Sequence, residues 1–186
     1  DNKERTFSQI EALADIAKTY GIVVVANLSE IVDKDTKDEK IYNTEVAISE
    51  QGVLLAKYHK LNPYYPKTFD TPSKETVVFT TSFDVKFGLF ICKDMLHDEP
   101  QKSLLGKENV KHFPYSVAVP SPLASFQFPR WAKKNGATIL ASNLGHGGSD
   151  ICGRASENVV EKKTVEIDKD SSYTIATVRI ESLPPN

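Results

Sequence analysis

The stretch FGLFICKDMLHDEP, residues 87–100, decides how the chain is interpreted. Apolar residues alternate and then run continuously up to position 91, which predicts a strand over residues 85–92 that is buried on both faces. The run ends at Cys92-Lys93-Asp94. Because a rigid strand followed by a polar turn is where α/β proteins present reacting groups, Cys92 is a candidate nucleophile. The alternative is that Cys92 is a small core hydrophobe, as buried cysteines usually are.

A second strand end carries a candidate cation. Strand-like segments at residues 42–49 and 53–58 flank the turn Glu50-Gln51-Gly52, which predicts a hairpin. Lys60 follows the second strand directly, at the end equivalent to that of Cys92. Prolines and aromatic residues fill residues 61–74 and predict a structured loop without a regular element.

The remaining pattern alternates helices with buried strands and predicts the α/β class. A helical stripe ends at Tyr20, where Gly21 supplies the stop. Residues 30–40 are charged and predict a solvated excursion. Further predicted helices begin at Pro100 and cover residues 126–135, and further predicted strands cover residues 22–26, 76–81, 116–119, 137–142, 165–168 and 173–180.

Length and charge narrow the class of protein. A chain of 186 residues with 40% hydrophobic content suits one domain, residues 1–186. Its net charge of −2 and lack of a basic run argue against nucleic acid as a partner. No apolar run is long enough to span a bilayer. The histidines His112 and His146 and the second cysteine, Cys152, lack metal-ligand spacing, so neither a metal nor a cofactor is expected.

The segment VLLAKYHKLNPYYPKTFDTP, residues 53–72, together with FGLFICKD, VAVPSP and ILASN, resembles the nitrilase or carbon-nitrogen hydrolase superfamily. The likeness is greatest to its biotinidase and vanin (pantetheinase) branch and extends over residues 10–152. It implies a four-layer αββα sandwich and a Glu-Lys-Cys triad. Lys60 and Cys92 match the lysine and cysteine of that triad, and the backbone N–H of Lys93 matches an oxyanion donor.

The chain also departs from the family pattern. The triad glutamate is expected on a strand upstream of the first helix, so the chain is predicted to be a partial domain that lacks its first strand-helix unit. Pro66, followed by Lys67, stands where relatives commonly have a second glutamate. Lys93 replaces an aromatic residue, and residues 120–143 form a shorter segment than in relatives.

Two histidines close to Cys92 and Lys60 in the sequence have to be distinguished from the triad. His97 and Asp98 follow Cys92 and suggest a Cys-His-Asp protease, but triad members commonly come from separate elements. His59 precedes Lys60 and is expected to point to the opposite face of its strand, in a surface or packing role.

The resulting hypothesis is a thiol-dependent hydrolase of a linear amide in a small vitamin-like molecule. The alternative is a catalytically inactive relative with a structural, storage or interaction role. Partners expected besides the small amide are a second copy of the chain or a chain that supplies the missing N-terminal part. The sequon Asn27-Leu28-Ser29 predicts glycosylation at Asn27, and together with the resemblance it favours an extracellular or secretory location, with a cytoplasmic one as the alternative.

Overall fold

The computed structural model of the protein describes residues 2–144, 147–153, 159–166 and 172–178. The chain divides into two units, residues 1–110 and 111–186. The expectation of one domain over residues 1–186 stays a prediction.

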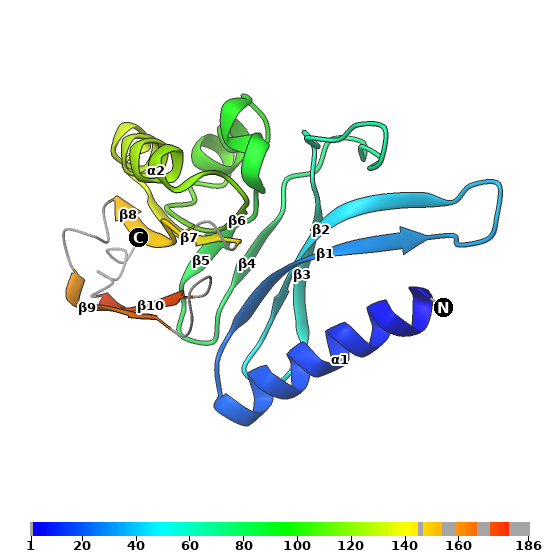
Figure 1. Ribbon diagram of the computed structural model, residues 1–186, viewed down its shortest axis with the longest axis horizontal. Coiled ribbons are helices and arrows are strands. Elements are labelled where there is room, and N and C mark those ends of the chain that lie inside the picture. The colour runs from blue at the N-terminus through cyan, green and yellow to red at the C-terminus, as the bar shows by residue number, and fades with distance from the viewer. Residues whose placement is uncertain (1, 145–146, 154–158, 167–171, 179–186) are drawn as a thin grey trace. The chain divides into compact units, whose positions relative to one another are not determined.

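The first unit begins with a helix on a three-stranded antiparallel sheet (Figure 1). The helix α1 (Asn2–Tyr20) ends where predicted, because Gly21 adopts a φ of 60° that few other residues tolerate. The sheet has the order β1-β2-β3, with β1 (Val24–Val32), β2 (Lys40–Ile48) and β3 (Leu54–His59). The predicted hairpin is confirmed as β2 and β3.

The first strand was predicted too short. It runs to Val32, where Val32 pairs with Lys40, so the expected solvated excursion shrinks to residues 33–39. The reason is that Glu30, within β1, is neutralised across the sheet by Lys57 at 2.7 Å. A charged residue that finds a cross-strand partner is compatible with a strand.

The second half of β2 is buried on both faces of the sheet. Since side chains alternate along a strand, β2 directs Val46 and Ile48 toward Ala17 of α1. The residue between them, Ala47, faces the other way and belongs to a second apolar cluster. We call this the inner cluster, and its buried members are Ala47, Tyr58, Phe79, Leu89 and Ile91.

The predicted strands around Cys92 are shorter than expected. They form an antiparallel pair, β4 (Val78–Thr80) and β5 (Lys86–Gly88). Residues 89–91 are buried but lie outside the strand, and a 3-10 helix follows at Cys92–Leu96. Burial alone cannot tell a strand from an extended segment, which explains the error. The helix expected from Pro100 is a short turn with a π-helix at Ser103–Lys107.

The second unit begins with a strand, a helix and a second strand. β6 (His112–Val117) and β7 (Thr138–Asn143) are parallel, and α2 (Ser121–Asn135) connects them. β7 also pairs antiparallel with β8 (Asp150–Gly153), and β9 (Val159–Glu166) pairs with β10 (Ser172–Val178). The ends of the two predicted C-terminal strands, residues 167–168 and 179–180, lie outside the described residues.

The helix α2 and the strand β6 both begin earlier than predicted. The predicted helix over residues 126–135 starts at Ser121, and Pro122 lies in its first turn. Proline is tolerated there because the N–H groups of that turn have no helical acceptor. The helix ends at Gly136 with a φ of 57°, as the sequence predicted.

Candidate functional site

Cys92 lies where a buried segment gives way to a helical turn. It follows Leu89, Phe90 and Ile91, which are at most 2% exposed, and is itself half-buried against the inner cluster. Its φ of 46° is unusual for a residue with a side chain. Strained backbone of this kind clusters at functional sites, where surrounding contacts hold it in place. Neither Cys92 nor Cys152 forms a disulfide.

Two residues beyond Cys92, the fully buried Asp94 receives four hydrogen bonds. Its Oδ2 accepts from the Ile91 N–H and from the Tyr58 hydroxyl, both at 2.9 Å. Its Oδ1 accepts from the backbone N–H and the side-chain amide of Asn62, again both at 2.9 Å. The carboxylate therefore joins the turn that carries Cys92 to the end of β3.

Tyr58 is the partner that β3 contributes. Its side chain is fully buried, and its hydroxyl also accepts a hydrogen bond of 3.2 Å from the Leu61 N–H. Burial, and then the charge of Asp94, raise the pKa of Tyr58 well above its usual range. The phenol therefore keeps its proton, and with it the hydrogen bond to Asp94, near neutral pH.

Lys60 stands between the two residues that Asp94 anchors, Tyr58 and Asn62. Only 4% of it is exposed, and its backbone N–H donates to the Asn43 carbonyl at 2.9 Å. Alternation places its side chain on the face of the sheet that bears the inner cluster, together with Tyr58. The structure therefore brings the backbone segments of Lys60 and Cys92 together, through Asp94.

Glu45 is a buried acid that the sequence interpretation missed. It is fully buried on β2 and stands opposite Tyr58 in the sheet register. It thus shares a face with Lys60, at a diagonal position. The signal that could have found it is its place directly before the apolar run Val46-Ala47-Ile48, where a strand buried on both faces is expected to carry no charged residue. Asp94 was missed because a polar residue in a turn is usually exposed.

The other sequence candidates differ in their burial. His97 and Asp98 are exposed, and Asp98 accepts a hydrogen bond of 2.7 Å from Lys102, so the Cys-His-Asp alternative has no support. Lys93 is half-buried in the first turn of the 3-10 helix. His112 is on β6, and His146 lies outside the described residues.

Asn27, the sequon residue, is exposed but within β1 rather than beyond it. Its Nδ2 donates to Asn43 Oδ1 at 2.8 Å and to the Thr44 carbonyl at 3.2 Å. It pairs with Glu45 and so points to the same face as Lys60. A glycan on that nitrogen would replace at least one of the two hydrogen bonds.

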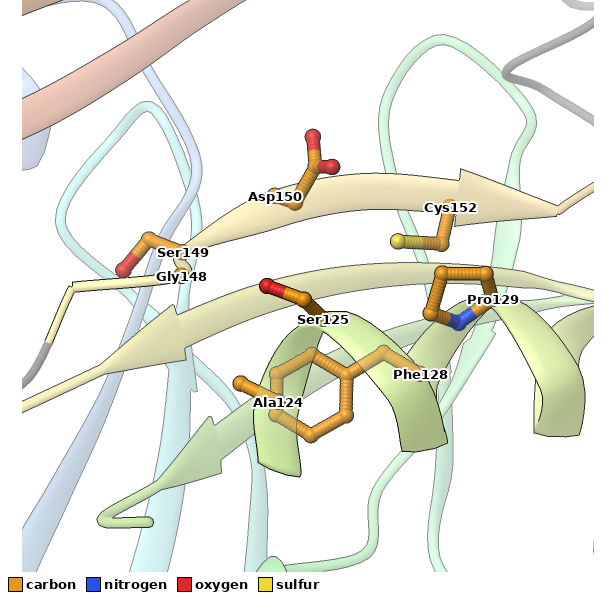
Figure 2. Close-up of a pocket in the computed structure, with 8 residues that line it drawn as sticks. All are labelled: Ala124, Ser125, Phe128, Pro129, Gly148, Ser149, Asp150 and Cys152. Carbon is orange, nitrogen blue, oxygen red and sulfur yellow. The ribbon is translucent and has the colours of Figure 1, made fainter. Parts of the chain in front are cut away.

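The second unit contains a small pocket of its own. Figure 2 shows it between α2 and β8, with Ser125 and Phe128 on one side and Asp150 and Cys152 on the other. Its volume of about 150 Å³ is below that of typical ligand pockets. We therefore do not assign a substrate to it.

The described part of the chain lacks two features, a cluster of metal ligands and a helix that could span a membrane. No group of three or more His, Cys, Asp or Glu side chains there could hold a metal ion. Likewise, none of the helices in the described ranges has the length and apolar character needed to cross a membrane.

Comparison with protein families gives one match, to the family described as carbon-nitrogen hydrolase, over residues 4–145. Among curated proteins, Vanin-like protein 3 of Drosophila melanogaster is 36% identical over 75% of this chain and 29% of its own length. Human pantetheinase is 32% identical over 82% of this chain and 33% of its own length. Rat biotinidase is 37% identical over 56% of this chain and 21% of its own length. The chain thus spans a third or less of these relatives.

Solved structures share the fold. A mutant of the Nesterenkonia AN1 amidase from the nitrilase superfamily gives a TM-score of 0.68 at 20% identity, over 92% of this chain and 68% of that one. Nit3 of Saccharomyces cerevisiae gives 0.61 at 23% identity, over 73% of this chain and 50% of that one. The α/β class and the nitrilase-like fold predicted from the sequence are therefore confirmed.

Proposed function

This chain belongs to the carbon-nitrogen hydrolase family, and from that premise we propose that it is a thiol-dependent hydrolase of a linear amide in a small vitamin-like molecule. Cys92 is the proposed nucleophile and Lys60 its electrostatic partner. The observation that carries the proposal is the Asp94 carboxylate, which ties the end of β3 to the turn after Cys92 through Tyr58 and Asn62.

The proposed chemistry follows from these groups. The Cys92 thiol gives its proton to a general base, the thiolate attacks the amide carbonyl carbon, the C–N bond breaks, and the base returns that proton to the leaving amine. Water then cleaves the thioester and releases the acid and the thiol. A cation near the sulfur stabilises the thiolate, and Lys60 is the buried cation at the adjoining strand end. The Lys93 N–H is the proposed donor to the tetrahedral oxygen.

The substrate class rests on the relatives. Two of them are named pantetheinase and biotinidase, so pantetheine and a biotin amide are the first probes. Release of the amine from either by the protein, and its loss in Cys92→Ser, is the expected result. Hydrolysis that survives in Cys92→Ser would contradict the assignment of the nucleophile.

Thiol reactivity tests the site without a known substrate. The rate of alkylation by iodoacetamide is measured at neutral pH for Cys92 and Cys152, in the folded protein and in the urea-unfolded chain. An activated Cys92 reacts faster folded than unfolded, whereas Cys152, at 4% exposure, reacts more slowly folded. A Cys92 that is protected by folding would argue against a nucleophile.

A second candidate function is a catalytically inactive relative with a structural, storage or interaction role. It is favoured by Pro66 and Lys67, which stand where the resemblance leads us to expect a second glutamate. Amide hydrolysis absent from both probes, combined with an unactivated Cys92, is the result that this alternative predicts.

Location and partners are part of the same proposal. The sequon at Asn27 and the family resemblance favour a secretory or extracellular location with a small amide as ligand, and the net charge of −2 argues against nucleic acid. Association with a second copy is tested by light scattering of the purified protein. A mass change at Asn27 after enzymatic deglycosylation of secreted protein would support the location.

A further inference from the structure

The face of the sheet opposite to Lys60 carries a cluster of charged side chains around His59. Its imidazole lies between two carboxylates: Nε2 is 2.9 Å from Glu30 Oε2, and Nδ1 is 3.0 Å from Glu75 Oε1. The other oxygen of Glu75, Oε2, accepts a hydrogen bond of 2.8 Å from the backbone N–H of His59. Side chain and main chain of one residue are thus both held by Glu75.

These contacts reach His59 from three separate parts of the chain. Glu30 belongs to β1, Glu75 to the loop before β4, and Tyr42 of β2 stacks on the imidazole with ring centroids 4.3 Å apart. The side chains of His59, Glu30 and Glu75 are 15%, 21% and 28% exposed. Partly shielded, charge-assisted hydrogen bonds constrain geometry more firmly than pairs in open solvent.

Further contacts fix Glu30 from the sheet itself. The Lys57 ammonium is 2.7 Å from Glu30 Oε1, and Thr44 donates to Glu30 Oε2 at 3.1 Å. Both oxygens of Glu30 are therefore engaged, and its carboxylate is held in place against the imidazole.

We propose that His59, Glu30 and Glu75 form a clamp that fixes the end of β3 and so positions Lys60; this inference rests on the proposed function. His59 is a positioning residue that acts through the next residue in the chain. Lys60 is then held from both faces of the sheet, by Asp94 through Tyr58 on one side and by Glu75 through His59 on the other. A lysine that stabilises a thiolate has to be held in place to act.

The test compares three variants with a matched control. His59→Leu removes both imidazole nitrogens. His59→Arg provides two hydrogen-bond donors again, in a rigid planar fork. Glu75→Gln removes one charge with little change of shape. Glu39→Gln is the control, because Glu39 is an exposed acid of the β1–β2 loop whose carboxylate caps the Asp35 N–H.

The first readout is hydrogen exchange of the Lys60 amide, which donates to Asn43. His59→Leu is expected to speed its exchange about tenfold relative to the β1–β2 ladder amides, with a smaller effect from Glu75→Gln. His59→Arg is expected to stay within about twofold of the unaltered protein. The second readout is the alkylation rate of Cys92, which should fall about tenfold in His59→Leu and recover in His59→Arg.

The outcomes separate the clamp from the proposed function. Unchanged Lys60 exchange in His59→Leu, or equal loss in the Leu and Arg variants, would overturn the clamp. A local loss of protection with a Cys92 that is unactivated even in the unaltered protein would support the clamp and overturn the hydrolase proposal. Where His59→Leu does not fold, Glu75→Gln against Glu39→Gln decides, and equal exchange in those two overturns the clamp.

Discussion

The hydroxyl of Tyr58 donates a hydrogen bond of 2.9 Å to Oδ2 of Asp94, and the two residues are 36 positions apart in the chain. Both side chains are fully buried. Tyr58 precedes the end of β3 by one residue, and Asp94 lies in the turn that begins at Cys92. This one bond therefore ties together the two segments that carry the proposed cation and the proposed nucleophile.

Substitution of Asp94 tests how much that tie contributes. Asp94→Asn replaces one accepting oxygen with an amide group that faces donors from Tyr58, Ile91 and Asn62. Each buried donor left unsatisfied is costly, so we expect the free energy of unfolding in urea to fall by about 2–4 kcal/mol. Asp98→Asn, at an exposed acid paired with Lys102, is the control and should cost less than about 0.5 kcal/mol. Equal losses would contradict a special role for Asp94.

Lys60→Met removes a buried charge and keeps a long apolar side chain. If the ammonium stabilises the Cys92 thiolate, the alkylation rate of Cys92 should fall about tenfold at neutral pH, and that of Cys152 should not change. The free energy of unfolding should be unchanged or higher, because a buried cation is costly to desolvate. A faster reaction of Cys92 in the variant would rule out Lys60 as its electrostatic partner.

Gly52 tests the packing of the β2–β3 turn against α1. It has a φ of 76°, and a Cβ there would lie 3.0 Å from the Ala14 carbonyl oxygen. Gly52→Ala should lower the free energy of unfolding by about 1–2 kcal/mol, from backbone strain and this close contact. Gly106→Ala, where a Cβ meets nothing within 4 Å, should change it by less than about 0.5 kcal/mol.

Acid should weaken the contribution of Glu30. Burial raises its pKa, but hydrogen bonds from Lys57 and His59 outweigh burial and hold the pKa below the ordinary 4.5. A carboxyl with a lowered folded-state pKa stabilises the protein above its unfolded pKa and loses that effect as the pH falls through the folded value. Urea unfolding at neutral pH should thus show Glu30→Gln less stable than the unaltered protein. That gap should shrink below pH 4.5, and a constant gap would contradict the prediction.

Much of the fold was predictable from local patterns. The helical stripe before Gly21, the hairpin around Gly52 and the helix that ends at Gly136 all depend on residues close together in sequence. A left-handed glycine after a periodic run is a local signal, because the preference belongs to that residue alone. The positions of Lys60 after a strand and of Cys92 after a buried run were also predictable locally, from the apolar pattern of the residues that precede each of them.

Errors arose where a distant partner decides the local structure. β1 continues through Glu30 because Lys57, on β3, neutralises its charge and His59, also on β3, hydrogen-bonds its carboxylate. The strand before Cys92 stops at Gly88, and the Ile91 N–H, which a longer strand would pair, donates to the Asp94 carboxylate instead. Neither partner can be identified from the residues next to it.

The sequence by itself determined the α/β class, the hairpin, the helix ends and the resemblance that singles out Lys60 and Cys92. Only the tertiary structure decided that Asp94 joins their two segments and that His59 is held between Glu30 and Glu75. The physical reason is that turn and helix preferences depend on a few neighbouring residues. A buried carboxylate, by contrast, is stable only where donors from several separate elements meet it, and the packing of the sheet brings those donors together.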